Sequence, residues 1–208
     1  DKKLGKHRLL AGAALRHTRY DDNSPATEQV ERTLLPGVFV QDEWQIGEHD
    51  QALGGMRLDW HPEHGAVWSP RFALHRHLTE NQSIRAGLGS GFRVVSLFTE
   101  DHAALSGARE VVVAEELNPE RSWSANLNYD LKIPAERFFI GLDISAFYTL
   151  FLNRILPDYD TDPQKIIYAN LDGRAVTRGL TLQLNYSDGL PLRLDAGISY
   201  MDVFQRDA

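Results

Sequence analysis

The feature that most constrains this chain is an alternation of apolar and polar residues that recurs in stretches of about ten residues. Residues 122–131 show it clearly, because Trp123, Leu127 and Leu131 fall on one face while serine and asparagine fill the other. Period two is the signature of a β-strand. The segments with this pattern are residues 7–18, 34–46, 51–61, 67–78, 82–93, 121–131, 137–152, 167–187 and 190–203. The sequence therefore predicts an all-β chain of about nine long strands.

Strand length and loop length carry independent signals about the fold class. Most segments exceed the ~5–6 residues usual in soluble sheets, and several match the ~9–11 residues with which a tilted strand crosses a bilayer. The tight connections are residues 47–50, 79–81, 132–136 and 188–189, and they alternate with three long connections, residues 19–33, 94–120 and 153–166, and one of intermediate length, residues 62–66. Outer-membrane barrels have tight periplasmic turns and longer outer loops. We expect an antiparallel up-and-down meander that is a portion of a large transmembrane β-barrel.

Composition excludes several other classes. The 208 residues carry a formal net charge of −7 and no cysteine, which argues against a nucleic-acid surface and leaves no thiol nucleophile. The mean hydropathy is −0.36, and no apolar run approaches the ~18 residues of a membrane-spanning helix. The Gly89-Ser90-Gly91 stretch lacks the setting of a hydrolase nucleophile. We expect no enzymatic activity and no cofactor.

The alternation assigns each residue to a face. The proposed lipid face holds Met56, Leu58, Trp60, Trp68, Phe72, Leu74, Ile140, Leu142, Ile144, Ala146, Tyr148, Leu150, Leu180, Leu182, Leu184 and Tyr186. The opposite face holds Arg57, Asp59, Arg71, His75, His77, Arg85, Asn126, Asn128, Asp143, Gln183, Asn185, Arg193 and Asp195. So polar a face suits a water-filled or plugged lumen. Asp42, Arg76 and Arg178 fall on the apolar face, and we expect them near the membrane interfaces, where a charge costs least.

Several motifs together resemble the TonB-dependent outer-membrane receptors. The Gly-Phe-Arg stretch within residues 89–100 is similar to the strand that enters a long outer loop in that family, and residues 117–123, Leu-Asn-Pro-Glu-Arg-Ser-Trp, are similar to the segment that opens the returning strand. Further pieces agree in order, at residues 39–44, 69–72, 147–155 and 170–179. Val94-Val95 departs from the Ala-Pro usual in the family after Gly-Phe-Arg.

The resemblance implies a barrel of about 22 strands with a plugged lumen, of which residues 1–208 form a partial barrel domain. We expect a chain excerpted from a longer receptor, because the N-terminal residues 1–6 have no signal-peptide character and no plug domain or TonB box is visible. The implied partners are outer-membrane lipid, the TonB complex acting through a plug domain, and a small-molecule or metal-chelate ligand. The implied location is the outer membrane of a Gram-negative bacterium.

Candidate ligand contacts lie in the proposed outer loop and lumen, and they are Arg93, Glu100, Asp101, His102 and Arg109. Loops at barrel mouths are where binding residues gather. A metal site needs three or four convergent ligands. His75-x-His77 on one strand face is only a weak candidate, and His61-x-x-His64 falls in an outer turn. We expect no metal site.

The function indicated is active uptake of a scarce ligand, which the sequence leaves open as a siderophore, cobalamin, a metal chelate or a glycan. Two alternatives remain. A soluble carbohydrate-binding β-sandwich would bury Trp60, Trp68, Trp123 and Leu142 between two sheets. A passive porin would instead need a lumen open to small solutes.

Overall fold

The computed structural model describes residues 1–21, 30–94, 109–171, 173–188 and 192–207. One large sheet dominates it, with strands in the order β1-β2-β3-β4-β5-β6-β8-β9-β12-β13. Their bounds are Lys2–Leu4, His7–Asp21, Val30–Gln45, Asp50–His61, Gly65–Thr79, Gln82–Arg93, Glu120–Pro134, Phe139–Asn153, Gly173–Ser187 and Arg193–Asp207. Within these residues there is no helix of the length and apolarity needed to cross a membrane.

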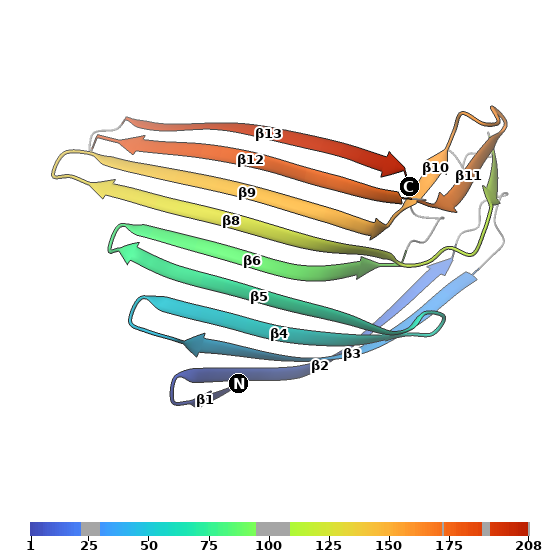
Figure 1. The fold of residues 1–208 in the computed structure, drawn as a ribbon, viewed down its shortest axis with the longest axis horizontal. Helices are drawn as coiled ribbons and strands as arrows, with labels where there is room; N and C mark the ends of the chain where they lie inside the picture. The colour runs from blue at the N-terminus through green and yellow to red at the C-terminus, as the bar shows by residue number, and fades with distance from the viewer. Residues whose placement is uncertain (22–29, 95–108, 172, 189–191, 208) are drawn as a thin grey trace.

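The sheet is an antiparallel meander, as the sequence predicts (Figure 1). Nine of its strands are 12 to 16 residues long and follow one another in the chain. The tight turns at residues 46–49, 80–81 and 135–138 all lie at one end, and the connection through β7, β10 and β11 lies at the other. The expected parity holds for these connections but fails between β4 and β5, where the outer-end connection, residues 62–64, is as short as the tight turns. We refer to the second end as the outer end.

The prediction of a single strand at residues 167–187 is wrong, because the structure has two strands there, β11 (Lys165–Asn170) and β12 (Gly173–Ser187). Gly173 has a φ of 137°, which an L side chain rarely adopts, and the chain changes direction there. β11 leaves the large sheet and pairs with β10 (Ile155–Asp158) and, in parallel, with β7 (Glu110–Val113). The connection predicted as a loop at residues 153–166 therefore contains a strand of its own.

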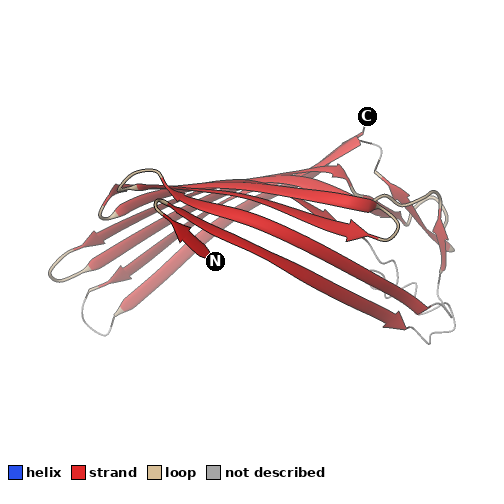
Figure 2. Ribbon diagram, turned by 90° about the horizontal axis from the view of Figure 1, so that it is seen from below, coloured by secondary structure: helices blue, strands red, loops and turns tan. Residues whose placement is uncertain are grey.

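The register confirms the assigned faces, because directly opposed residues share a face. Leu58 on β4 lies opposite Trp68 on β5, and Leu142 on β9 lies opposite Leu184 on β12. The apolar face is uncovered, since the exposed fraction is 60% for both Trp60 and Trp68 and 58% for Leu74. The sandwich alternative is wrong on this point, because these side chains are not enclosed between two sheets. Figure 2 shows that the large sheet is a single curved layer.

The tight turns are staggered across the sheet. One row of directly opposed residues runs across seven strands through Trp44, Ala52, Leu74, Ala86, Leu127, Ala146 and Leu180. Beyond this row β3 continues one residue to Gln45, whereas β12 continues seven residues to Ser187. Strands staggered in this way tilt relative to the axis of a barrel.

The three charges predicted on the apolar face, Asp42, Arg76 and Arg178, each have a partner. Asp42 Oδ2 lies 2.7 Å from His7 Nδ1, and Arg178 Nη2 lies 2.8 Å from Asp202 Oδ2. Arg76 Nε lies 3.6 Å from Asp50 Oδ1. Pairing lowers the cost of a charge next to lipid. The expected interfacial position of these groups stays a prediction.

The buried core among the described residues is small and lies mainly at the outer end. Ile155, Ile166 and Tyr168 form a buried cluster, with Leu117 packed against it. These residues come from β10, β11 and the segment before β8. The small sheet is thus held by its own apolar contacts, while the large sheet is held by its hydrogen-bonded ladder.

Candidate functional site

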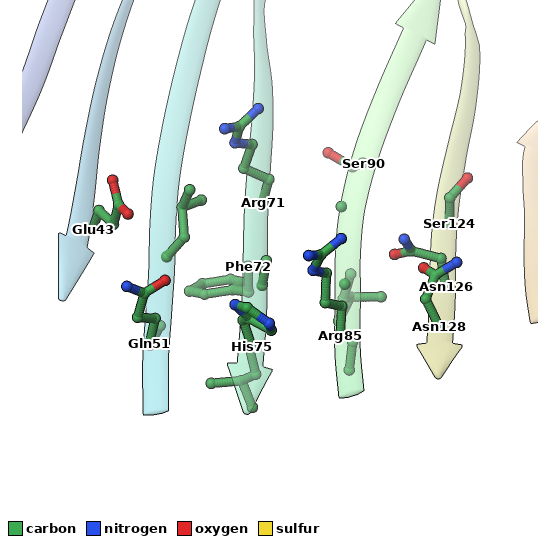
Figure 3. A pocket seen from close by; sticks show the side chains of 18 of the residues that line it. Glu43, Gln51, Arg71, Phe72, His75, Arg85, Ser90, Ser124, Asn126 and Asn128 are labelled. Atoms are coloured by element: carbon green, nitrogen blue, oxygen red, sulfur yellow. The ribbon is translucent and has the colours of Figure 1, made fainter. Parts of the chain in front are cut away.

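The polar face of the large sheet forms a groove of about 630 Å³ over β3 to β8. Because side chains alternate along each strand, every second residue of these neighbouring strands faces it. The polar side chains that line it are Glu43, Gln51, Arg71, His75, Arg85, Ser90, Ser122, Ser124, Asn126 and Asn128, most of which Figure 3 labels. The volume falls within the ~300–1,000 Å³ typical of small-molecule sites.

Two arginines give the groove cationic donors. Arg71 Nη2 donates a hydrogen bond of 2.6 Å to Gln41 Oε1, which holds its guanidinium over the sheet. Arg85 lies directly opposite His75 in the register. Within the part of the chain that the structure describes, no hydrogen bond or ion pair engages Arg85. Its donors are available to an anionic solute.

Other groups of this face are held by hydrogen bonds. Asn128 Nδ2 donates to Ser145 Oγ over 2.6 Å, and Ser145 Oγ donates to Asp143 Oδ1 over 3.1 Å. Ser83 Oγ donates to Asp130 Oδ2 over 3.2 Å. These bonds span three neighbouring strands, so the polar wall is ordered before any ligand arrives.

Arg57 and Asp59 form a two-bond ion pair on the same face. Arg57 Nε lies 2.7 Å from Asp59 Oδ2, and Arg57 Nη2 lies 2.6 Å from Asp59 Oδ1. Asp59 is only 2% exposed, and its carboxylate occupies the space that a side chain at Gly37 would need. The alternation of side chains along β4 places both residues on the polar face but does not reveal that they pair. The pairing depends on the side-chain rotamers and on the small residue Gly37 beside them.

His75 and His77 do lie together as the sequence indicates. Their ring centroids are 4.4 Å apart with the planes tilted by 57°. In the described ranges no third histidine, cysteine or carboxylate converges on this pair with metal-site spacing. The pair stays a weak candidate.

At the outer end the structure describes two of the five predicted ligand contacts. Arg93 Nε lies 2.7 Å from Glu120 Oε2, and the Arg109 guanidinium lies 6.0 Å from the centre of the Tyr159 ring. The other three, Glu100, Asp101 and His102, lie outside the described residues. The five ligand contacts therefore stay a prediction.

An asparagine cluster that sequence reasoning missed joins the outer segments. Asn170 Oδ1 accepts from the Asn118 backbone N–H at 2.9 Å and from Asn153 Nδ2 at 3.2 Å. Asn153 Nδ2 also donates to the Asn118 carbonyl over 3.0 Å. All three residues lie in segments of family resemblance, which is the one signal that marked them.

The turn after β10 has one perturbed group. Asp158 Oδ2 accepts from Thr161 Oγ1 at 2.6 Å, and Asp158 Oδ1 accepts from the backbone N–H groups of Asp160 and Thr161. These hydrogen bonds, the Thr161 hydroxyl first, lower the pKa of the Asp158 carboxyl from its ordinary value. The turn is thus more stable when the Asp158 carboxyl is ionised.

Comparison with known proteins adds a family and several relatives. Residues 3–208 match the family model described as TonB dependent receptor-like, beta-barrel. Over 156 residues the chain is 27% identical to the iron-regulated outer membrane virulence protein of Vibrio cholerae, a match that covers 72% of this chain and 23% of that protein. The chain spans just under a quarter of the length of these curated relatives.

Solved structures share the fold. The siderophore receptor PirA from Pseudomonas aeruginosa superimposes with a TM-score of 0.78 at 21% identity, covering 96% of this chain and 40% of that one. The FrpB iron transporter from Neisseria meningitidis gives 0.74 at 16% identity, with 98% and 34% covered. The ferric enterobactin receptor PfeA from Pseudomonas aeruginosa gives 0.70 at 18% identity, with 95% and 33% covered.

Proposed function

The chain belongs to the TonB-dependent receptor family, and from this premise we propose that it forms part of the barrel wall of a receptor that imports a ferric siderophore. The family resides in the outer membrane of Gram-negative bacteria, and so does this chain. Residues 1–208 are proposed to be a partial barrel domain of a longer protein. In that protein a plug domain would engage the TonB complex.

The observation that carries the proposal is the groove on the polar face, where two arginines, Arg71 and Arg85, outnumber the one carboxylate, Glu43. Ferric complexes of catecholate or carboxylate siderophores are anionic and rich in oxygen acceptors. Arg71 and Arg85 supply charge-assisted donors, and Ser124, Asn126 and Asn128 supply neutral ones. The names of the relatives, a siderophore receptor and an iron transporter, favour iron chelates over cobalamin or glycans.

The outer rim would make the first contact. Arg109 is the proposed contact on the described part of the loop, and Glu100, Asp101 and His102 remain proposed contacts of the same loop. Arg93 is proposed to act mainly through its pairing with Glu120. Transport would then proceed from the rim to the groove.

The test is uptake by the full-length receptor, expressed in a strain that lacks its own siderophore receptors. We expect saturable uptake of radioactive iron from a catecholate or carboxylate siderophore, and loss of this uptake when the tonB gene is deleted. The double variant R71A/R85A is expected to weaken uptake about tenfold or more. Arg137→Ala, in the tight turn at residues 135–138, is the matched control and should leave uptake unchanged.

Other outcomes would point elsewhere. Small-solute flux that persists without TonB would identify a passive porin. Uptake of cyanocobalamin or a maltooligosaccharide in place of iron would replace the siderophore as the ligand while leaving the family unchanged.

A further inference from the structure

A turn at the outer end gathers three side chains of metal-ligating type. β4 ends at His61 and β5 begins at Gly65, with His61 and Gly65 opposed as the last pair of the ladder. Gly65 has a φ of 67°, the left-handed conformation that glycine adopts without strain. The chain therefore reverses within residues 62–64, which brings His61, Glu63 and His64 together. Figure 1 places this turn at the end of the sheet opposite the tight turns.

The donors of these three residues converge. The ring centroids of His61 and His64 are 4.7 Å apart, with planes inclined by 23°. One ligand atom from each of His61, Glu63 and His64 lies within 4.8 Å of the other two. Among the residues that the structure describes, no other set of three or more such donors reaches this spacing. A histidine pair becomes a credible site when a third ligand converges on it, and Glu63 is that third ligand.

The surroundings favour a cation. The turn lines a pocket of about 410 Å³ together with the segment before β8, which contributes Glu115 and Glu116. Glu115 Oε1 accepts a hydrogen bond of 2.8 Å from the Asn170 backbone N–H, which fixes that carboxylate. Arg32 also lines the pocket, so three carboxylates share it with one guanidinium. His61 is only 5% exposed, so its imidazole is already largely removed from water.

We propose that His61, Glu63 and His64 bind a divalent transition-metal ion of the Zn²⁺ class at the outer rim of the barrel. Two imidazoles and one carboxylate suit zinc and its neighbours, whereas calcium and magnesium prefer oxygen ligands alone. On the side of the ion that faces the pocket, the remaining coordination positions would be filled by Glu115, Glu116 or water. This site is separate from the siderophore groove and goes beyond the proposed uptake function.

Binding requires a modest rearrangement of the turn. His61 Nδ1 accepts two long hydrogen bonds, 3.2 Å from the Glu63 N–H and 3.4 Å from the His64 N–H. A metal at this nitrogen would replace both. Donors bound at ~2.0–2.1 Å to one tetrahedral zinc lie about 3.4 Å apart, so atoms that now lie up to 4.8 Å apart must approach one another by at most about 1.4 Å. Rotation of the Glu63 and His64 side chains is sufficient, since Glu63 is exposed and His64 half-buried.

The test is Zn²⁺ binding by the intact receptor, purified in detergent without a polyhistidine tag and stripped with a chelator. Competition with a chromogenic chelator gives stoichiometry and affinity, and Co²⁺ absorption in the visible range reports the ligand field. We expect about one equivalent of Zn²⁺, with affinity lowered about tenfold or more by H64Q and by E63Q. These variants change residues that are not buried, so they avoid the folding risk of replacing His61.

The double variant H75Q/H77Q is the matched control, because it removes the other close histidine pair from the same protein. It should bind Zn²⁺ as the unmodified receptor does. Unchanged affinity in H64Q and E63Q, absence of Zn²⁺ binding, or loss of binding in H75Q/H77Q alone would each overturn the proposal. Siderophore uptake is measured separately, so failure of the metal site is distinguishable from failure of the proposed function.

Discussion

Arg93 and Glu120 form an ion pair at the outer end of neighbouring strands, with Arg93 Nε 2.7 Å from Glu120 Oε2. The other carboxylate oxygen, Glu120 Oε1, accepts a hydrogen bond of 3.0 Å from the backbone N–H of Ile155. One buried side chain thus links β6 and β8 to the start of β10. The link lies between the large sheet and the small one.

Removing this carboxylate should loosen the small sheet. We expect E120A to destabilise residues 153–171 by about 1–3 kcal/mol, because the Ile155 N–H loses its acceptor in a buried place. The measurement is amide hydrogen exchange, which should become faster in residues 155–170 if the small sheet is destabilised. Glu110→Gln is the control, since Glu110 is exposed and its contact with Lys165 is 3.8 Å long. Equal exchange in the two variants would contradict the linking role.

The Arg178–Asp202 pair on the apolar face should be coupled. D202L leaves Arg178 without its carboxylate partner next to lipid, and we expect a loss of about 1–2 kcal/mol in unfolding free energy. R178L/D202L should regain most of it, because two leucines suit this face. Urea unfolding in lipid vesicles of the four proteins of the cycle gives the coupling energy. Additive losses would show that the pair is not coupled.

All four tryptophans should contact lipid. The exposed fractions are 43% for Trp44, 60% for both Trp60 and Trp68, and 37% for Trp123, and the register puts all four on the apolar face. Single-tryptophan variants in vesicles of brominated lipid are expected to be strongly quenched. A tryptophan that keeps its fluorescence would place its strand with the opposite face outward.

Gly179 should not tolerate a side chain. A Cβ there would lie 2.6 Å from the Phe147 ring and 2.8 Å from the Tyr200 carbonyl oxygen, and the backbone oxygen cannot move aside. We expect G179A to destabilise the sheet by about 1–3 kcal/mol. Gly197→Ala is the matched control, because a Cβ at that position meets nothing closer than 3.6 Å. Thermal unfolding of the two variants is the comparison, and equal midpoints would refute the packing argument.

The turn at residues 158–161 should depend on pH. The pKa of Asp158 is lowered in the folded state, so its stabilising effect is present above the ordinary carboxyl pKa and is lost as pH falls through the lowered value. Hydrogen exchange at Thr161, corrected for intrinsic rates, should show less protection at the acid end. D158N should remove this pH dependence. If it persists in D158N, another group is responsible.

Periodicity predicted the large sheet well because each strand is a local pattern with one apolar face. It failed at residues 171–173, since the departure of β11 depends on its pairing with residues 110–113, which lie more than fifty positions away. The same reason hid the Asn118, Asn153 and Asn170 cluster. The sequence did not indicate Glu63 as a candidate ligand, because its proximity to His61 and His64 arises from the turn and not from strand alternation.

The staggered turns have a consequence for motion through a barrel built this way. On the polar face Gln41 lies four residues from the tight-turn end of β3, yet its row of register partners leads strand by strand to Thr177, four residues from the outer end of β12. Each row of opposed residues therefore runs obliquely to the axis of such a barrel. A solute that binds successive polar side chains along such a row would move around the pore axis while it moves along it, so its path would be a spiral.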